Sequence, residues 1–292
     1  MTLAVLLLLT GLTALGGYIW FTEWAKDAEF DAALLPTATA MPTILDRYGN
    51  EMEYAADDYI APSDIPEVVK GAFVALDDRR FYSHKGYDVK AMLRALVRNV
   101  TSGGMVEGAS TITQQLVKNT HLSSERTLKR KLNEIAIAMK IEENYSKDEI
   151  LAMYLSVIYF GAGAYGINQA SRVYFGCSPD RLTAAQAATL AGILKNPARY
   201  SPKNSIKRAT ERRDLVLDVM CREGYLTEEE RDAAKKEKMR LAEESGTRDD
   251  RAAQYVAAAV DEVCKLLGMT EYRLQNSGLT VMTAYDPEHQ KR

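Results

Sequence analysis

The sequence predicts a mainly α-helical protein with a membrane-spanning helix at its N-terminus. Two observations predict the helices: helix-capping patterns recur along the chain, and stretches that alternate polar and apolar residues are scarce. The third observation is that residues 3–21 are apolar except for two threonines, about the length a helix needs to cross a bilayer. The formal net charge of -3 over 292 residues argues against a nucleic-acid-binding protein.

The apolar segment ends in an aromatic cluster that includes Trp20, Phe21 and Trp24, which is typical of a membrane interface. A cleaved signal peptide is the alternative. No basic segment precedes the apolar run, however, and the run is longer than the apolar core of an ordinary signal peptide. Only Lys26 lies close behind it, among several acids, which weakly favours a C-terminal domain outside the cell. We therefore expect a single-pass protein of the cytoplasmic membrane with an extracytoplasmic domain.

The elements that follow are predicted in chain order. Residues 25–62 form a connector with a short strand or hairpin at 44–54. Helices are expected at 65–76 with Ser63 as N-cap, at 89–100 with Asp88 as N-cap, at 111–119 and at 126–143. Three capping boxes then predict helices through residue 158, through residue 194 and in the charged stretch beyond 226; they are Ser146-x-x-Glu149, Thr183-x-x-Gln186 and Thr227-x-x-Glu230.

The last stretch, GLTVMTAY at 278–285, alternates like a strand. A single unpaired strand is poorly stable, so we expect a second domain to begin here in relatives or in a longer version of the protein. The domain boundaries predicted in this way are a membrane anchor at 1–24, the connector at 25–62, a helical domain at 63–268 with its motifs within 70–205, and the start of a linker at 269–292.

Cysteine and histidine give no sign of a metal site. The three cysteines have no C-x-x-C spacing, and none of the three histidines is spaced from another as a paired ligand would be. The sequence therefore predicts neither a disulfide framework nor a dedicated protein-bound metal.

Three segments carry candidate chemistry. Residues 77–86 place two acids at the end of one predicted helix beside His84 and a glycine turn, although an acidic loop is more often simply solvated. In GASTITQQLVKN the spacing predicts Ser110, Gln114 and Lys118 on one helix face, where three donors suit an extended anion. In RTLKRKLNE, the spacing predicts that residues 126, 130 and 134 form a polar stripe on one helix face. The alternative interpretation of residues 130 and 134 is an exposed ion pair that contributes about 0.3 to 0.5 kcal/mol.

In this order and at this spacing, the segments resemble the peptidoglycan glycosyltransferases of family 51. This family comprises the polymerase domain of bifunctional penicillin-binding proteins and the monofunctional transglycosylases. Residues 77–86 are similar to E-D-x-x-F-x-x-H-x-G, residues 108–115 to G-x-S-T-I-T-Q-Q, and residues 126–134 to R-x-x-x-R-K-x-x-E. Two further stretches fit, KDEILAMYLSVIYFGAGAYGI and YFGCSPDRLTAAQAATLAGILKNPARYSP, so the resemblance covers residues 60–205.

The resemblance implies a lysozyme-like helical domain that polymerises lipid II. The donor would be a growing glycan on undecaprenyl diphosphate, and the reaction would invert the donor's anomeric centre to give a β-1,4 glycan. No cofactor is implied, although Mg²⁺ or Mn²⁺ could screen the diphosphate. The implied partners are lipid II, the membrane and other cell-wall synthases, with no nucleic acid.

The resemblance also implies roles for individual residues. Asp77 takes the position of the general base, and Glu134 takes that of the second carboxylate. Lysines and arginines would bind the phosphates of the departing group. The implied substrate-binding residues are Asp78, Phe81, His84, Gly86, Gly108, Ser110, Thr111, Gln114, Gln115, Lys118, Arg126, Arg130 and Lys131.

The sequence departs from the family pattern at the first catalytic position, where Asp77 replaces glutamate. Aspartate is one methylene shorter, and a displacement of about 1 Å can lower a rate on the order of a hundredfold. Ser156, Cys177 and Gln186 also replace the usual residues, at positions where we expect small effects. Three hypotheses follow: an active glycosyltransferase, a non-catalytic membrane-bound scaffold that binds lipid II or synthases, and a lysozyme-like hydrolase. The basic stripe disfavours the hydrolase.

The C-terminal GLTVMTAYDPEHQ resembles the start of the linker that leads to a transpeptidase in bifunctional penicillin-binding proteins. The chain contains no S-x-x-K, S-x-N and K-T-G set. We therefore expect that penicillin does not acylate it.

Overall fold

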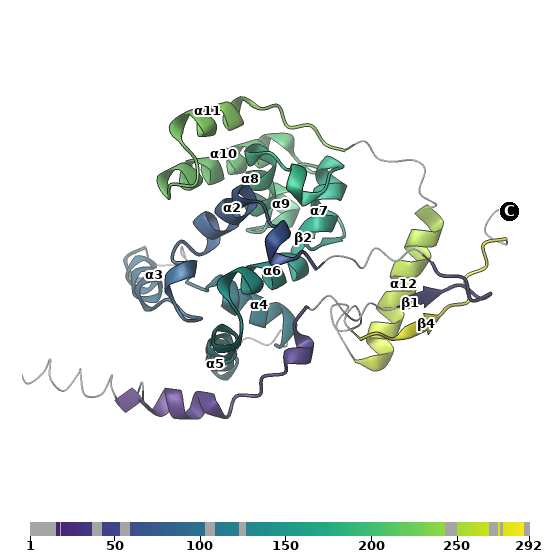
Figure 1. The fold of residues 1–292 in the computed structure, drawn as a ribbon, viewed down its shortest axis with the longest axis horizontal. Coiled ribbons are helices and arrows are strands. Elements are labelled where there is room, and N and C mark those ends of the chain that lie inside the picture. Colours follow the sequence, from purple (N-terminus) through teal and green to yellow (C-terminus); the bar gives the residue numbers. More distant parts are fainter. Residues whose placement is uncertain are drawn as a thin grey trace, which may run out of the picture.

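The structure is a computed structural model that describes residues 16–17, 19–36, 43–52, 59–102, 109–122, 127–242, 250–268, 274 and 277–288. Within these ranges the protein is mainly helical, as predicted (Figure 1). Most of the apolar segment at 3–21 lies outside them. Among the described residues, no helix is both long enough and apolar enough to cross a membrane. The membrane anchor stays a prediction.

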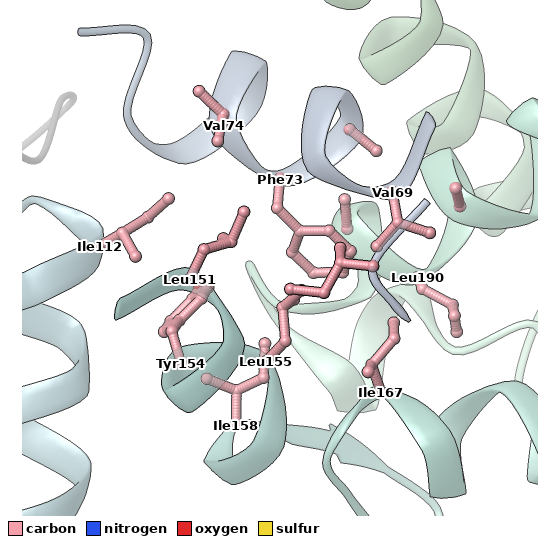
Figure 2. Close-up of a cluster of buried hydrophobic side chains, with 14 of the residues drawn as sticks. Val69, Phe73, Val74, Ile112, Leu151, Tyr154, Leu155, Ile158, Ile167 and Leu190 are labelled. Carbon is pink, nitrogen blue, oxygen red and sulfur yellow. The ribbon is translucent and has the colours of Figure 1, made fainter. Parts of the chain in front are cut away.

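Three helices meet at the centre of the main body: α2 (Glu67–Asp77), α6 (Lys147–Val157) and α8 (Ala184–Ile193). Their inward side chains form one apolar core, in which Phe73, Leu151 and Leu190 are fully buried (Figure 2). Each such side chain contributes about 1.5 to 3 kcal/mol when buried. The alanine-rich α8 is apolar on nearly every side, which is why it runs through the interior rather than along the surface.

Other elements pack around this centre. α4 (Ile112–Thr120) lies against α5 (Leu128–Asn144) and α6, while α10 (Ile206–Arg222) lies against α2 and α8. The remaining elements of the main body are α3 (Val89–Thr101), α7 (Ile167–Phe175), α9 (Pro197–Tyr200), α11 (Glu228–Lys236), the strands β2 (Tyr159–Gly161) and β3 (Ala164–Tyr165), and the 3-10 helices η1 (Ala32–Leu34), η2 (Pro62–Asp64), η3 (Phe81–Ser83) and η4 (Pro179–Arg181).

A second, smaller group lies beside the main body and joins two distant parts of the chain (Figure 1). Strand β1 (Thr43–Leu45) pairs in parallel with β4 (Thr280–Met282), and α12 (Asp250–Leu267) packs against them. Ile44 from the connector is buried together with Val256 and Val260 of α12. The C-terminal strand is therefore paired within this chain, and the second domain expected to begin at it stays a prediction. The partner strand comes from the far end of the sequence, and strand periodicity does not reveal pairing partners.

Most predicted helix starts are confirmed. The side chain of Asp88 accepts a hydrogen bond from the backbone N–H of Ala91 and begins α3. All three predicted capping boxes are formed, at the starts of α6, α8 and α11. The predicted solvated outer helix is α11, in which only Ala234 is buried.

Two helices start two residues later than predicted. α2 begins at Glu67 because Pro66 occupies the N-cap position, so Ser63 lies in the short helix before it. α5 begins at Leu128, because the Thr127 hydroxyl accepts from a backbone N–H of the first turn. Of the stripe predicted for residues 126, 130 and 134, Arg130 and Glu134 lie on α5, and residue 126 lies outside the described residues.

Candidate active site

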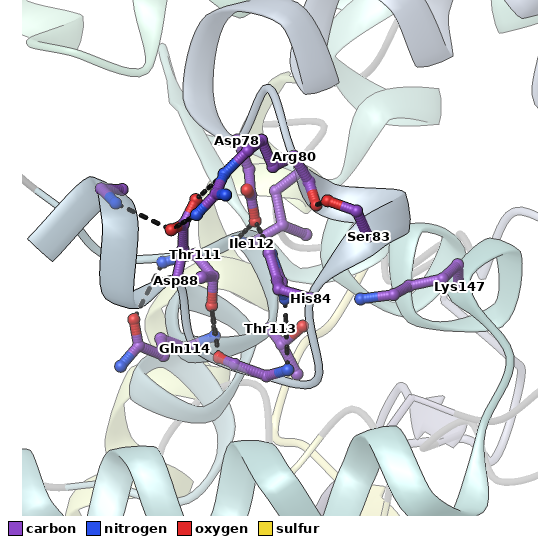
Figure 3. Close-up of polar contacts among 12 residues, drawn as sticks. Asp78, Arg80, Ser83, His84, Asp88, Thr111, Ile112, Thr113, Gln114 and Lys147 are labelled. Atoms are coloured by element: carbon purple, nitrogen blue, oxygen red, sulfur yellow. Dashed lines mark hydrogen bonds and ion pairs between the residues drawn. The ribbon is translucent and has the colours of Figure 1, made fainter.

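The loop after α2 is held by a buried hydrogen-bond network around Asp78 (Figure 3). Asp78 Oδ2 accepts from the backbone N–H of Ile112 at 3.0 Å and lies 2.8 Å from His84 Nε2. The N–H of Gly86 donates to His84 Nδ1 at 3.2 Å, so Nε2 carries the hydrogen that His84 donates to Asp78. Asp78 and His84 therefore connect this loop to the first turn of α4.

Gly86 is required at a close approach between the loop and α5. Its φ of +89° lies in the region that favours glycine, and a Cβ there would come within 2.8 Å of the Ala138 carbonyl group. The Thr111 hydroxyl donates to the Gly86 carbonyl oxygen at 2.7 Å. The buried Phe81 lies edge-on to His84 in the same loop. These predicted site residues thus hold the loop in place.

The start of α4 differs from the prediction. Thr111 is the N-cap, and it forms a capping box with Gln114, whose side-chain oxygen accepts from the Thr111 N–H at 2.9 Å. Gln114 is buried as a result, and Ser110 lies outside the helix. The prediction that residues 110, 114 and 118 share one helix face was wrong, because the capping box turns the side chain of residue 114 toward the interior. The spacing Thr111-x-x-Gln114 is itself a capping-box pattern and could have revealed this.

The second predicted carboxylate, Glu134 of α5, is buried with only 2% of its surface exposed. Lys131 Nζ forms a close ion pair with it and also donates to Ser110 Oγ at 3.0 Å. A guanidinium nitrogen of Arg130 lies 3.8 Å from Glu134 Oε2. The exposed ion pair considered as the alternative is thus not what forms. Instead, a buried acid holds two cations beside the residues that precede α4.

Arg130 leaves a donor free in this cluster. Its Nε is buried and has no hydrogen-bond partner among the residues that the structure describes. A buried donor without a partner is costly, and it is expected where a ligand supplies the missing acceptor. Lys118 lies on the exposed surface of α4. Two other predicted site residues, Gly108 and Arg126, lie outside the described residues.

Asp77, the predicted general base, is the last residue of α2 and is half-buried. The Tyr154 hydroxyl donates to its Oδ2 at 3.2 Å. Burial raises the pKa of Asp77 from 3.8 to about 6, and the charge of Asp78 acts in the same direction. The hydrogen bond from Tyr154 and the positive charge of Arg212 oppose this rise in the pKa. Neither Tyr154 nor Arg212 was among the site residues predicted from the sequence.

Both carboxylates are connected to the beginning of α4. The Tyr154 hydroxyl that contacts Asp77 also lies 3.4 Å from Gln115 Oε1 in the first turns of α4. Glu134 reaches Ser110, just before α4, through Lys131. A carboxylate with a raised pKa can accept a proton at neutral pH, and neighbouring cations can stabilise a negative leaving group.

A carboxylate whose pKa is perturbed by burial marks a candidate functional site. The sequence model of the transglycosylase family matches residues 42–221, which is more than half of the chain. The chain therefore belongs to the transglycosylase family, and the predicted membership is confirmed. Among the described residues, no cluster of histidine, cysteine and acidic side chains is arranged to hold a metal ion.

Two relatives from one organism agree with this membership. The chain is 44% identical to penicillin-binding protein 1A/1B of Bacillus subtilis over 240 residues, or 80% of this chain and 26% of the relative. It is 36% identical to penicillin-binding protein 1F of the same organism over 290 residues, or 98% of this chain and 40% of the relative. A crystal structure of penicillin-binding protein 1A from Haemophilus influenzae aligns with this chain at 23% identity and a TM-score of 0.46. The alignment covers 88% of this chain and 28% of the chain in that structure. The chain thus spans about a quarter to two fifths of the length of these relatives.

Proposed function

We propose that this protein is a peptidoglycan glycosyltransferase that polymerises lipid II into β-1,4 glycan and releases undecaprenyl diphosphate. The observation that carries the proposal is Asp77, a carboxylate with a raised pKa that Tyr154 links to α4. A second, buried carboxylate on α5 lies among cations near the start of α4. Family membership supports the reaction class. The protein would act from the outer face of the cytoplasmic membrane, to which residues 1–24 would anchor it.

In the proposed reaction, Asp77 accepts the proton of the acceptor sugar's 4-hydroxyl. The freed oxygen attacks the donor's anomeric carbon and forms the new glycosidic bond. The bond from that carbon to the diphosphate oxygen breaks, and the electron pair leaves with the diphosphate, so the anomeric centre inverts. Lys118, Arg130 and Lys131 would stabilise the departing charge together with Arg126, and Glu134 would orient the cations. Mg²⁺ or Mn²⁺ would accompany the substrate's diphosphate and not occupy a resident site.

A second candidate is a non-catalytic protein that binds lipid II or synthase partners in the membrane. The observation that favours it is the short side chain of Asp77, whose carboxylate is hydrogen-bonded to Tyr154 within the protein. A base held inside the protein has less reach toward a substrate than the family's longer glutamate. The residues that would bind the diphosphate are the same in both candidates.

Polymerisation of purified lipid II by the detergent-solubilised protein tests the proposal. We expect the wild type to polymerise and Asp77→Ala to lose activity on the order of a hundredfold or more. If wild type and Asp77→Ala are both inactive while Asp77→Glu polymerises lipid II, the non-catalytic binding protein is the favoured candidate. An Asp77→Ala variant as active as the wild type would remove this residue from the mechanism.

Binding of diphosphate lipid is measured separately. Lys118→Ala is expected to weaken binding, whereas Lys203→Ala, a change at an exposed lysine outside the proposed site, is the control and should leave it unchanged. Equal binding by wild type and Lys118→Ala would argue against a phosphate-binding role for Lys118.

A further inference from the structure

The hydroxyl of Tyr154 has two acceptors and one hydrogen. Tyr154 is fully buried in α6, and its oxygen lies 3.2 Å from Asp77 Oδ2 and 3.4 Å from Gln115 Oε1. An ionised carboxylate is a stronger acceptor than an amide, so the hydrogen goes to Asp77 while Asp77 is charged. Once Asp77 is protonated, the same hydrogen can turn to Gln115. The hydroxyl is therefore fixed by two helices and responds to the charge on Asp77.

Arg212 lies on α10, which packs against α2, the helix that ends at Asp77. Its guanidinium stacks on the Tyr200 ring at 5.7 Å, and its Nε is buried without a hydrogen-bond partner in the part of the chain that the structure describes. A Cβ at Gly192 would lie 3.0 Å from Arg212 Cγ, so the glycine leaves room for this side chain. Packing and stacking hold the guanidinium, and its charge acts on Asp77, lowering the pKa of that carboxyl.

From this arrangement we infer that Tyr154 and Arg212 are positioning residues for the Asp77 carboxylate. Tyr154 fixes Oδ2 and leaves Oδ1, which has no hydrogen bond among the described residues, to receive the proton of the acceptor hydroxyl. Arg212 favours the ionised form of the carboxylate that the proton transfer requires. The inference rests on the proposed role of Asp77 as general base, and it adds two residues that lie on helices α6 and α10, outside the predicted site.

The test is the pH dependence of kcat/KM for lipid II polymerisation by the full-length protein in detergent, with Tyr154→Phe and Arg212→Gln. Each change removes one interaction that favours ionised Asp77. We expect the acid limb of the profile to move up by about one pH unit in each variant, with a loss in kcat/KM of about twofold at pH 7 from protonation alone. Arg212→Lys keeps the charge and should keep most of the wild-type profile.

Two control variants separate positioning from a loss of packing. Tyr174→Phe removes another buried hydroxyl, which donates to the Phe160 carbonyl oxygen at 3.0 Å; it should lower stability and leave the acid limb in place. Arg208→Gln removes an exposed arginine from the same helix as Arg212. It should change neither the stability nor the acid limb of the pH profile. If Tyr154→Phe and Arg212→Gln keep the wild-type acid limb, the inference is overturned.

A measurement without substrate keeps this inference distinct from the proposed function. Carbon NMR of isotope-labelled aspartate follows the Asp77 carboxyl through its titration, with Asp77→Asn to assign the signal. A higher pKa for Asp77 in both variants, in a protein that does not polymerise lipid II, would support the positioning and contradict the function. Polymerisation by the wild type with an unchanged pKa in both variants would support the function and contradict the positioning.

Discussion

Replacing Asp77 with asparagine should stabilise the protein at neutral pH. Burial raises the pKa of this carboxyl from 3.8 to about 6, so the folded protein holds the proton more tightly than the unfolded chain does. Asparagine has nearly the same shape and carries no charge. Its oxygen can still accept the hydrogen bond from Tyr154, so the change removes mainly the cost of a buried negative charge.

The sign and size of the effect follow from proton linkage. Below pH 3.8 the carboxyl is neutral in both states, and the two proteins should be equally stable. As pH rises from 3.8 to about 6, the unfolded chain ionises first, and the folded wild type loses stability by about 1.36 kcal/mol for each pH unit. Over the whole interval from pH 3.8 to about 6, the folded wild type loses about 3 kcal/mol of stability. Since Asp77 keeps some contact with solvent, we expect about 2 to 3 kcal/mol at pH 7.

Denaturant unfolding of wild type and Asp77→Asn at several pH values between 4 and 8 measures this difference. The difference in unfolding free energy between Asp77→Asn and wild type should grow between pH 4 and 6 and stay constant above pH 6. Because all other titrating groups are common to both proteins, their contributions cancel. A gap that does not change with pH, or an asparagine variant that is the less stable at pH 7, would refute the reasoning.

The remaining predictions concern the groups around this carboxylate. Asp78→Ala removes the acceptor for the first N–H of α4 and should lower the unfolding free energy by about 3 kcal/mol in denaturant titrations. Gly86→Ala introduces a Cβ against the α5 backbone at positive φ and should cost about 3 kcal/mol by the same assay. Glu134→Gln leaves two cations without their acid and should cost about 2 kcal/mol, less at high salt. The kcat/KM of lipid II polymerisation should fall about tenfold per pH unit below pH 6, where Asp77 becomes protonated.

The helices could be predicted from the sequence because their signals are local. The capping box at Ser146 uses residues three apart, and the apolar spacing of the following turns predicts which face is buried. The order of the motifs also sufficed to predict the family. The same local reasoning could have predicted the inward position of Gln114, because Thr111 and Gln114 have capping-box spacing.

The environment of Asp77 could not be predicted in this way. Arg212 is one of many charged residues in a helix with an ordinary amphipathic pattern, and nothing at short range distinguishes it from the exposed Arg208. Only the packing of α10 against α2 and α8, with Gly192 leaving space for the side chain, brings it near the carboxylate. The pairing of β1 with β4 could not be predicted from local patterns either, because it depends on contacts between distant parts of the chain.

In the proposed reaction, the burial of Asp77 lowers stability and favours catalysis at the same time. A solvated aspartate with a pKa near 3.8 would be ionised at pH 7, but it would be a weak base. Burial alone would raise the pKa further and leave too little of the ionised form. Arg212 and Tyr154 limit the rise, so the carboxyl is strengthened as a base and still mostly ionised at neutral pH. This balance needs a hydroxyl from α6 and a guanidinium from α10, and it explains why two residues outside the predicted site bear on the chemistry of a third.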